Sequence, residues 1–484
     1  MAPQYKNVTL RRYDHNLVVV GAGSAGLVAA LVASTARARV VLVERHKMGG
    51  DCLHTGCVPS KALIASAKTV QQLNEATNYG LSGVQGDVDF EAVMARVHRI
   101  IATIAPKDSI ARYESLGVTC VQGHAEIRDP HCVSVDGVTY KTKNILIASG
   151  AEPVVLPIPG LDDDECLTSS NLWSIQELPG RLIVVGGGPI GCELAQAFNR
   201  LGSDVTLVEN EDRLLPREDE EVGTMMRDIF RREGVRVLTG YRPDRCFKKR
   251  LSVTGPTSAE KLDFDRILIA VGRRPRTTGM GIEKLGIKTE ANGTLTVDRY
   301  LRTTVNSIYV AGDVVGPYQF THMAGHQAWI ATANALARPF WRYALDESVV
   351  PWATYTDPEV ARVGLSEERA RAIGHDVVVT HYGLDDVDRA QTEGRTEGFV
   401  KLVTARGNDR LLGALVVGSE AGEIISEYVT AMSHGLGLRK ILSTVHVYPT
   451  RMDAARLAAG TWRRNNVSER LLGLSQRLND YMRL

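Results

Sequence analysis

The same short pattern occurs twice in this chain, and it limits the possible folds more than any other feature of the sequence. Each copy has an apolar run, a Gly-x-Gly-x-x-Gly turn, a helix-forming stretch and a second apolar run that ends at a glutamate. The glutamate follows the first glycine at the same spacing in both copies, at position 44 after 21 and at 209 after 186. The residues concerned are Gly21, Gly23, Gly26 and Glu44 in the first copy, and Gly186, Gly188, Gly191 and Glu209 in the second.

Each part of this pattern suits the binding of a dinucleotide. The first glycine allows a tight turn from strand to helix, the second lets the backbone approach a pyrophosphate, and the third lets helix and strand pack closely. The helix N-terminus then faces the phosphate charge, and the acid accepts a hydrogen bond from a ribose hydroxyl. Two incidental glycine turns are the alternative, but a strand, a helix and an acid accompany both copies. The repeat therefore predicts an α/β protein with two Rossmann-like domains and two dinucleotides.

The composition is that of an ordinary globular protein with several domains. A chain of 484 residues is longer than one hydrophobic core usually supports. Its 57 basic and 56 acidic side chains leave a formal net charge of +1, which gives no electrostatic reason to bind nucleic acid or an anionic membrane. Residues 1–16 are polar, unlike a signal peptide, and no apolar run is long enough to span a bilayer. We therefore expect a cytoplasmic protein without nucleic-acid or membrane partners.

The acid of the second copy indicates which nicotinamide nucleotide binds there. A carboxylate at Glu209 accepts a hydrogen bond from a ribose 2′-hydroxyl and repels a 2′-phosphate, whose usual partner is arginine. Arg213 lies four residues further on and could hold such a phosphate. The balance favours NADH over NADPH.

A close pair of cysteines, Cys52 and Cys57, follows the first copy, whereas the other five cysteines are scattered. Residues 62–73 have helical periodicity, and Pro59 suits the first turn of that helix. Cys57 would then lie at a helix N-terminus, where the dipole favours the thiolate and lowers the pKa. A thiolate in this position can pass electrons to or from a flavin. Cys52, expected to be the more exposed sulfur, is left to exchange with a substrate.

Two other interpretations of the pair compete with a redox role. A structural disulfide is disfavoured in a reducing compartment. The other interpretation is a zinc half-site that uses His46, His54 and both cysteines, with a second cysteine pair elsewhere in the chain to supply closure. No such pair is present in the sequence, so we predict no metal site.

These motifs resemble the pyridine nucleotide–disulfide oxidoreductases, a family that includes lipoamide dehydrogenase, glutathione reductase and mercuric reductase. The resemblance covers nearly the whole chain. It includes Cys52-x4-Cys57-Val-Pro-Ser-Lys61, Ala148-Ser-Gly150, Ala270-Val-Gly272-Arg-Arg-Pro275 and Thr303-Thr-Val-Asn-Ser-Ile-Tyr-Val-Ala-Gly312-Asp313. It implies that the first dinucleotide is FAD, that Asp313 contacts the ribityl chain, and that Lys61 lies near the flavin and pairs with Glu193. It also adds Gly50, Gly150, Gly272 and Gly312 to the cofactor-binding residues.

The family layout implies three domains and a homodimer. FAD would be bound by residues 12–149 and 276–348, the nicotinamide nucleotide by the inserted residues 150–275, and residues 349–484 would form an α+β dimerisation domain. In that last domain the sequence predicts strands at residues 377–380, 398–403 and 413–417, followed by a helix at residues 422–433.

The chain departs from the best-known relatives near its C-terminus, where Tyr448 stands in place of the catalytic histidine and Asp453 in place of glutamate. A histidine with a pKa of about 6.5 accepts a thiol proton near neutrality, whereas a neutral tyrosine with a pKa of about 10 is a poor base. His446 could partly substitute, because residues two apart in an extended segment share a face. Asp453 also suits a capping box with Thr450 for the helix that follows.

The segment with this tyrosine resembles that of mercuric reductases more than that of lipoamide dehydrogenases. The paired C-terminal cysteines of mercuric reductases are missing, however, because the last cysteine is Cys246. We therefore expect an enzyme that moves electrons from NADH through FAD and the Cys52–Cys57 disulfide to a small-molecule disulfide, a protein disulfide or a soft metal ion. One alternative is dithiol oxidation with NAD⁺, as in dihydrolipoamide dehydrogenase. Another is a flavin electron-transfer or interaction protein with little disulfide turnover.

Overall fold

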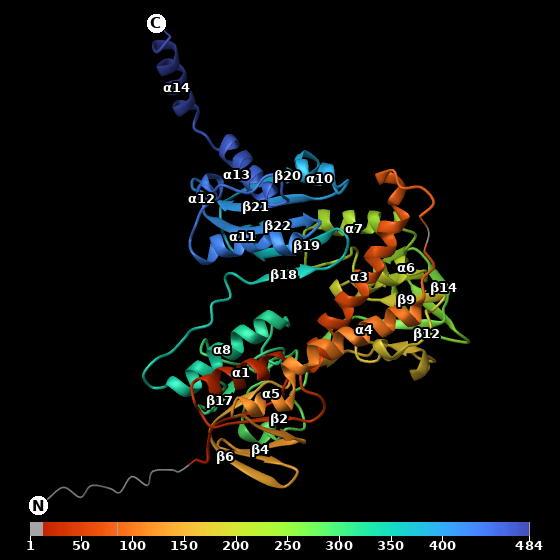
Figure 1. The fold of residues 1–484 in the computed structure, drawn as a ribbon, viewed down its shortest axis with the longest axis vertical. Helices are drawn as coiled ribbons and strands as arrows, with labels where there is room; N and C mark the ends of the chain where they lie inside the picture. Colours follow the sequence, from red (N-terminus) through yellow and green to blue (C-terminus); the bar gives the residue numbers. More distant parts are fainter. Residues whose placement is uncertain (1–12, 85, 484) are drawn as a thin grey trace, which may run out of the picture.

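Each copy of the repeat contributes parallel strands to one sheet, and the two sheets lie in the lower and right-hand parts of the ribbon drawing (Figure 1). The structure is a computed structural model, and it describes residues 13–84 and 86–483. The predicted start of the first domain at residue 12 and most of the polar N-terminal segment lie outside the described residues.

The first unit combines a sheet with helices from both ends of its sequence. Its strands are β1 (His15–Val20), β2 (Val40–Glu44), β3 (Thr119–Gln122), β4 (Ala125–Asp129), β5 (Cys132–Val135), β6 (Val138–Ile147) and β17 (Ile308–Val310). Its helices are α1 (Ser24–Thr35), α2 (Gly50–His54), α3 (Cys57–Asn74), α4 (Phe90–Ile104), α5 (Ile110–Ser115) and α8 (Thr321–Ala337). The strand order is β3-β2-β1-β6-β5-β4, with β17 beside β6. The parallel strands β1 and β2 are almost wholly apolar because helices cover the sheet.

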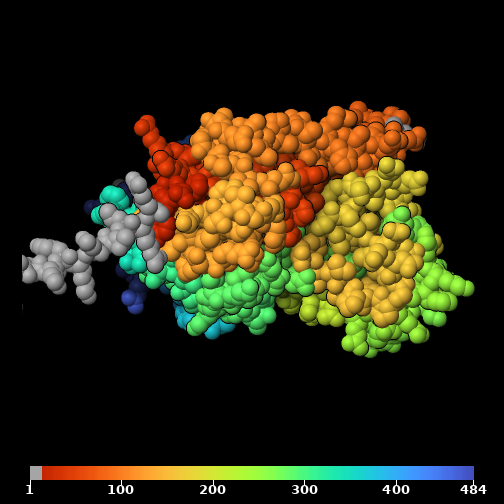
Figure 2. Space-filling view, turned by 90° about the horizontal axis from the view of Figure 1, so that it is seen from below, coloured from red at the N-terminus to blue at the C-terminus, as the bar shows by residue number. Residues whose placement is uncertain are grey.

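The segment that follows the second unit returns to this first sheet. β17 pairs in parallel with β6, and the backbone N–H of Ile127 donates to the carbonyl of Met280 at 2.8 Å. In the space-filling view the returning segment, in green, therefore lies against strands of the first sheet, in orange (Figure 2).

The second unit has a smaller parallel sheet and an antiparallel one. The strands of the parallel sheet, in spatial order, are β11 (Arg236–Thr239), β10 (Asp204–Glu209), β9 (Arg181–Val185), β15 (Arg266–Ile269) and β8 (Cys166–Leu167). The antiparallel strands are β12 (Arg242–Cys246), β13 (Arg250–Thr254) and β14 (Ala259–Asp263). The helices are α6 (Pro189–Arg200) and α7 (Glu220–Arg232), and a short ribbon of β7 (Ala151–Pro153) and β16 (Arg273–Pro275) lies where the chain enters and leaves the unit.

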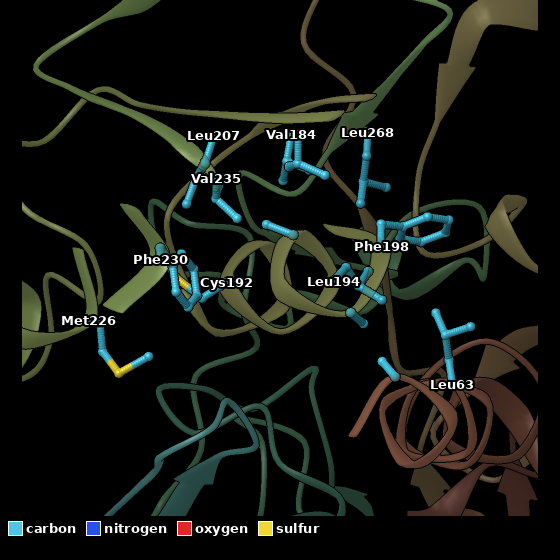
Figure 3. Packing of buried hydrophobic residues seen from close by; sticks show 14 of the residues in the cluster. Leu63, Val184, Cys192, Leu194, Phe198, Leu207, Met226, Phe230, Val235 and Leu268 are labelled. Atoms are coloured by element: carbon cyan, nitrogen blue, oxygen red, sulfur yellow. The ribbon is translucent and has the colours of Figure 1, made fainter. Parts of the chain in front are cut away.

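Helix α6 lies between its own sheet and the first unit. One face packs on strand residues such as Val184 and Leu207, and the core continues to Leu63 of α3 (Figure 3). All of these side chains are at most 2 % exposed. One continuous core therefore fixes α6 against the helix that carries Cys57.

The C-terminal unit is an antiparallel sheet covered by helices, at the top of Figure 1. Its strands, in spatial order, are β18 (Pro351–Thr354), β19 (Glu359–Gly364), β22 (Leu411–Gly418), β21 (Phe399–Ala405) and β20 (Val377–Gly383). Its helices are α9 (Glu367–Ala372), α10 (Asp388–Thr392), α11 (Ala421–Ser433), α12 (Leu438–Ser443), α13 (Asp453–Asn465) and α14 (Glu469–Tyr481). The three predicted strands and the predicted helix are present, with bounds that differ by up to three residues. The predicted fold class, an α/β chain with a C-terminal α+β domain, is confirmed.

Two ion-pair networks hold the second unit to the C-terminal unit. Arg362 of β19 donates to Glu218 at 2.7 Å and also pairs with Asp219, just before α7. Arg200 of α6 contacts Asp357 at 3.0 Å. Both arginine side chains are at most 5 % exposed, and buried charges of this kind are tolerated only when they are paired. The pairs therefore define how these two units sit against each other.

Within the described ranges, no helix combines the length and the apolar character that crossing a bilayer would require.

Candidate active site

One large cavity of about 1790 Å³ receives both glycine turns and the cysteine pair. Drug-sized ligands usually occupy about 300–1,000 Å³, so this cavity has room for more than one such molecule. Fifteen of the residues predicted from the sequence line it: Gly21, Gly23, Glu44, Gly50, Cys52, Cys57, Lys61, Gly150, Gly186, Gly188, Glu193, Glu209, Gly272, Gly312 and Asp313.

The first glycine turn has the close contacts that the sequence predicts. A Cβ atom on Gly26 would lie 1.8 Å from the carbonyl oxygen of Gly21, so only glycine lets α1 approach β1 this closely. Glu44 accepts hydrogen bonds from the backbone N–H groups of Ala22 at 2.7 Å and His46 at 2.8 Å. These bonds orient the carboxylate at the end of β2, where a ribose would lie.

Gly50 closes the other side of the same turn. Its φ is +58°, and a Cβ atom there would lie 2.6 Å from the Cα of Gly23. The backbone of the cysteine-bearing segment therefore packs directly on the glycine turn. This places the cysteines beside the predicted pyrophosphate position.

The second glycine turn repeats the geometry of the first. A Cβ atom on Gly191 would lie 1.8 Å from the carbonyl oxygen of Gly186. Glu209 accepts from the backbone N–H of Gly187 and, at 2.7 Å, from that of Glu211. The N-terminus of α6 thus faces the cavity as the N-terminus of α1 does.

The structure has the two cysteines as free thiols, and Cys57 is the first residue of α3, as predicted. A hydrogen bond from Cys52 lowers the pKa of Cys57 to about 5, helped by Thr321 and by the charge of Lys61. The same hydrogen bond, together with burial, raises the pKa of Cys52. The pair therefore carries one proton on Cys52 and a thiolate at Cys57 near neutral pH.

Both sulfurs of the pair line the main cavity, and in the chain by itself Cys57 is exposed and Cys52 is partly exposed. The hydroxyl of Thr321, the first residue of α8, lies 3.4 Å from the Cys57 sulfur. Close sequence spacing thus placed both sulfurs at the site.

Lys61 and Glu193 form the ion pair that the family resemblance implies. The Lys61 Nζ donates to Glu193 Oε2 at 2.8 Å, one turn of α3 beyond Cys57. The other Glu193 oxygen accepts from the backbone N–H of Tyr355 at 2.8 Å. The Lys61 ammonium also lies 4.5 Å from the centre of the Tyr355 ring. The three residues come from the three different units and meet at the cavity wall.

A second charged cluster surrounds Asp313. Burial raises the pKa of the Asp313 carboxyl, and the neighbouring Arg273 opposes that shift. Arg273 Nε lies 3.6 Å from Asp313 Oδ2, and the guanidinium also pairs with Asp51. A buried carboxylate next to the cavity can accept hydrogen bonds from ligand hydroxyl groups.

The residues present fit FAD in the first unit. The glycine turn needs glycine at Gly26 and Gly50 and leaves the helix N-terminus open to the cavity. Glu44 would hold the ribose of the adenosine half, and Asp313 the ribityl half, as the resemblance implies. Both acids line the same cavity as Cys57.

The C-terminal motif does not reach this cavity within the same chain. Tyr448 is 66 % exposed and donates from its hydroxyl to Asp388 Oδ2 of α10 at 2.7 Å, which raises the pKa of Tyr448. Asp453 is buried at the start of α13 and accepts from the Thr450 N–H at 3.2 Å. That bond is one half of the predicted capping box, and the Thr450 hydroxyl donates to Val447 instead.

The expectation that His446 shares a face with Tyr448 is wrong. His446 turns inward, with Nε2 2.8 Å from Glu427 Oε1 of α11 and Nδ1 3.0 Å from the Thr444 carbonyl. Its side chain is 8 % exposed, whereas Tyr448 points to solvent. The segment consists of bends rather than an extended strand, so the alternation of faces does not apply.

Sequence reasoning missed Thr321 and Tyr355 and assigned no role to Arg273. Arg273 lies in a motif that was recognised, so its position carried a signal. Thr321 is 264 residues from Cys57, and Tyr355 is 162 residues from Glu193. Thr321 meets Cys57 inside the first unit, and Tyr355 meets Glu193 where the C-terminal unit packs on the second. No local pattern in the sequence marks either residue.

Comparisons with known proteins agree with the geometry. The family model described as pyridine nucleotide-disulphide oxidoreductase matches residues 15–328, and its dimerisation domain matches residues 350–459. A dihydrolipoyl dehydrogenase of Thermus scotoductus is 35% identical over 93% of this chain and 97% of its own length. A mercuric reductase of Lysinibacillus sphaericus is 32% identical over 94% and 84%.

Solved structures show the same similarity. The Cu(II) complex of the HOCl-induced flavoprotein disulfide reductase RclA from Escherichia coli superposes with a TM-score of 0.81 at 28% identity. It covers 93% of this chain and 99% of the RclA chain.

Proposed function

The chain belongs to the pyridine nucleotide-disulphide oxidoreductase family, and we propose that it passes electrons from NADH by way of FAD and the Cys52–Cys57 pair to a disulfide or a soft metal ion. Membership identifies an FAD-dependent enzyme, so a flavin protein with little disulfide turnover is not supported. The observation that carries the proposal is that both glycine turns and the cysteine pair line one cavity. When bound, FAD accepts a hydride from the nicotinamide nucleotide and passes two electrons to the disulfide form of the pair.

The reduced pair then acts by thiol–disulfide exchange. Cys52 loses its proton and attacks one sulfur of a substrate disulfide, forming a mixed disulfide and releasing the first product thiol, which takes up a proton. The Cys57 thiolate attacks the Cys52 sulfur, releases the second thiol and restores the Cys52–Cys57 disulfide. With a soft metal ion as substrate, both thiolates would bind the ion.

Lys61 and Thr321 support the thiolate of Cys57 in this proposal, and Glu193 positions Lys61. The Lys61 charge and the Thr321 hydroxyl both favour the deprotonated form of Cys57. Glu193 holds Lys61 at 2.8 Å and is itself held by the Tyr355 backbone. Lys61 thus keeps its charge beside the redox centre in a fixed position.

The preference for NADH rests on the acids at the end of β10 and directly after it. Glu209 is 8 % exposed and lines the cavity, and the next residues include the carboxylate of Glu211 in the same wall. A 2′-phosphate placed here would meet two negative charges. Arg213 and Arg217 are the nearby positive charges in the sequence, and only Arg217 lines the cavity.

The working form is proposed to be a homodimer, because residues 350–459 match a dimerisation domain. Val445 is 96 % exposed and Val447 is 78 % exposed, beside the exposed ring of Tyr448. Apolar side chains this exposed suit a subunit interface. Tyr448 of the partner subunit would then hydrogen-bond the substrate or a thiolate.

We also propose that the enzyme acts in the cytoplasm, where its thiols stay reduced.

Substituting Cys57→Ser tests the cysteine role. The purified protein should bind FAD and still reduce a dye with NADH, but disulfide turnover should fall by about a thousandfold or more because the nucleophilic relay is broken. One equivalent of NADH added without oxygen should produce a long-wavelength absorbance band in the native enzyme and none in the variant. Cys120→Ser, at a scattered cysteine, is the control. Native enzyme without this band would refute the proposal.

Dithiol oxidation with NAD⁺ is the second candidate, because a dihydrolipoyl dehydrogenase is 35% identical over nearly the whole chain. Tyr448 argues against it, since its raised pKa makes it a still poorer base near neutrality. Comparing kcat/KM for dihydrolipoamide with NAD⁺ against lipoamide, glutathione disulfide and mercuric ion with NADH separates the two candidates.

A further inference from the structure

The last helix, α14, is attached to the C-terminal unit but buries none of its side chains in its own chain. It projects from the body of the molecule at the top of Figure 1. Its 13 residues are about the length at which an isolated helix is marginal in water. A helix of this length therefore needs a packing partner for its stability.

One face of α14 carries an apolar stripe of Leu471, Leu474, Leu478 and Tyr481, spaced by three, four and three residues. These side chains are between 57 % and 75 % exposed. The spacing is that of the seam of paired helices, in which apolar residues repeat every three and four positions. The opposite face carries Glu469, Gln476 and Asp480. A continuous exposed stripe of this kind marks a contact surface.

We infer that α14 packs its apolar stripe against the second subunit of the dimer, and this inference rests on the proposed homodimer. The position of the helix in the chain identifies the occupant. The dimerisation domain matches up to residue 459, inside α13, and only three residues separate the end of α13 from the start of α14. The stripe therefore continues directly from a domain that forms dimers, on a connection too short to carry it away from that interface.

A helix that extends from one subunit can pack on the other subunit, and two-fold symmetry then forms this contact twice. The chain has a further exposed apolar region in Phe340 and Trp341, which are 81 % and 70 % exposed beyond the end of α8. An apolar stripe that left the dimer uncovered would favour aggregation, whereas packing on the partner covers it.

Photocrosslinking of the purified full-length holoenzyme tests the inference. Tyr481→p-benzoylphenylalanine places the probe on the stripe, and Gln476→p-benzoylphenylalanine places it on the opposite face. We expect the probe at position 481 to give a covalent dimer on a denaturing gel and the probe at 476 to give at least fivefold less. Adding Leu474→Glu and Leu478→Glu to the first variant should remove the crosslink, whereas the matched pair Gln476→Glu and Asn479→Glu should leave it.

Light scattering of the same samples separates the two levels of the inference. A dimer that crosslinks as described supports it, and the Leu474→Glu, Leu478→Glu variant should then dissociate at roughly tenfold higher concentration. A dimer without an intersubunit crosslink at position 481 overturns the role of α14 and leaves the homodimer intact. A monomer at all concentrations overturns the proposed homodimer together with this inference.

Discussion

The two nucleotide units use the same backbone geometry and differ in the side chains around it. In both, a Cβ atom on the third glycine would lie 1.8 Å from the carbonyl of the first. In both, the acid after the second strand accepts the N–H of the residue that follows the first glycine. This close contact leaves no room for a side chain on the third glycine. The two copies are therefore alike at the contact between the helix and the glycine turn.

The charges next to the two acids are opposite. Glu44 is followed by Arg45, His46 and Lys47, whereas Glu209 is followed by Asn210, Glu211 and Asp212. The first site is thus basic beside its acid and the second is acidic. The comparison teaches that the two copies share the backbone of the glycine turn and differ in the charge of the residues after the acid.

The helices of the two units differ in the same way. The position seven residues after the first glycine is Val28 in α1 and Glu193 in α6. Val28 packs near Gly325 of α8, inside the first unit, whereas Glu193 leaves its own unit to hold Lys61. The second copy therefore contributes to the redox site of the first.

The largest effect should come from adding one methyl group to the third glycine of either unit. Gly26→Ala forces the same backbone clash as Gly191→Ala. Each substitution should therefore lower the affinity of its own unit for its nucleotide by about a hundredfold. Gly26→Ala protein should be purified nearly without flavin, whereas Gly191→Ala protein should keep its flavin and show a raised KM for NADH. Gly473→Ala, where the added atom meets open space, is the control. Flavin loss in both variants would mean that the two units are not independent.

A smaller effect is expected at the two acids. Glu209→Gln removes one of the charges that oppose a 2′-phosphate, so the ratio of kcat/KM for NADPH over NADH should rise by roughly tenfold. Glu44→Gln is the matched control, because it should lower FAD retention and leave that ratio unchanged. A ratio that responds to Glu44→Gln, or not to Glu209→Gln, would contradict the assignment of the two sites.

The smallest effect concerns the thiols of the two units. Cys57 has a pKa lowered to about 5, whereas complete burial raises the pKa of Cys192 in α6. Alkylation of Cys57 in the reduced enzyme should therefore rise with pH through about 5 and be constant by neutrality, while Cys192 stays unmodified. Thr321→Val removes a hydrogen bond to the thiolate and should move the midpoint upward by less than about one pH unit. Mass spectrometry of the alkylated peptides measures both, and a midpoint near 9 would contradict the stabilised thiolate.

The sequence by itself determined the features that depend on spacing within a short stretch. The glycine turns with their acids were predictable because a tight turn and a close backbone contact need glycine at set positions. Cys57 at the start of α3 was predictable from Pro59 and from the helical periodicity that follows. The pairing of Lys61 with Glu193 came from the resemblance to a family, since nothing in the local pattern joins residues 132 positions apart.

Only the tertiary structure decided which side chains complete the site and which turn away from it. Tyr355 reaches the redox centre because the C-terminal unit packs on the other two, and Thr321 because α8 folds back within the first unit. His446 turns inward because Glu427 of α11 offers a carboxylate. These outcomes depend on burial and on partners far away in the chain, which local periodicity does not encode.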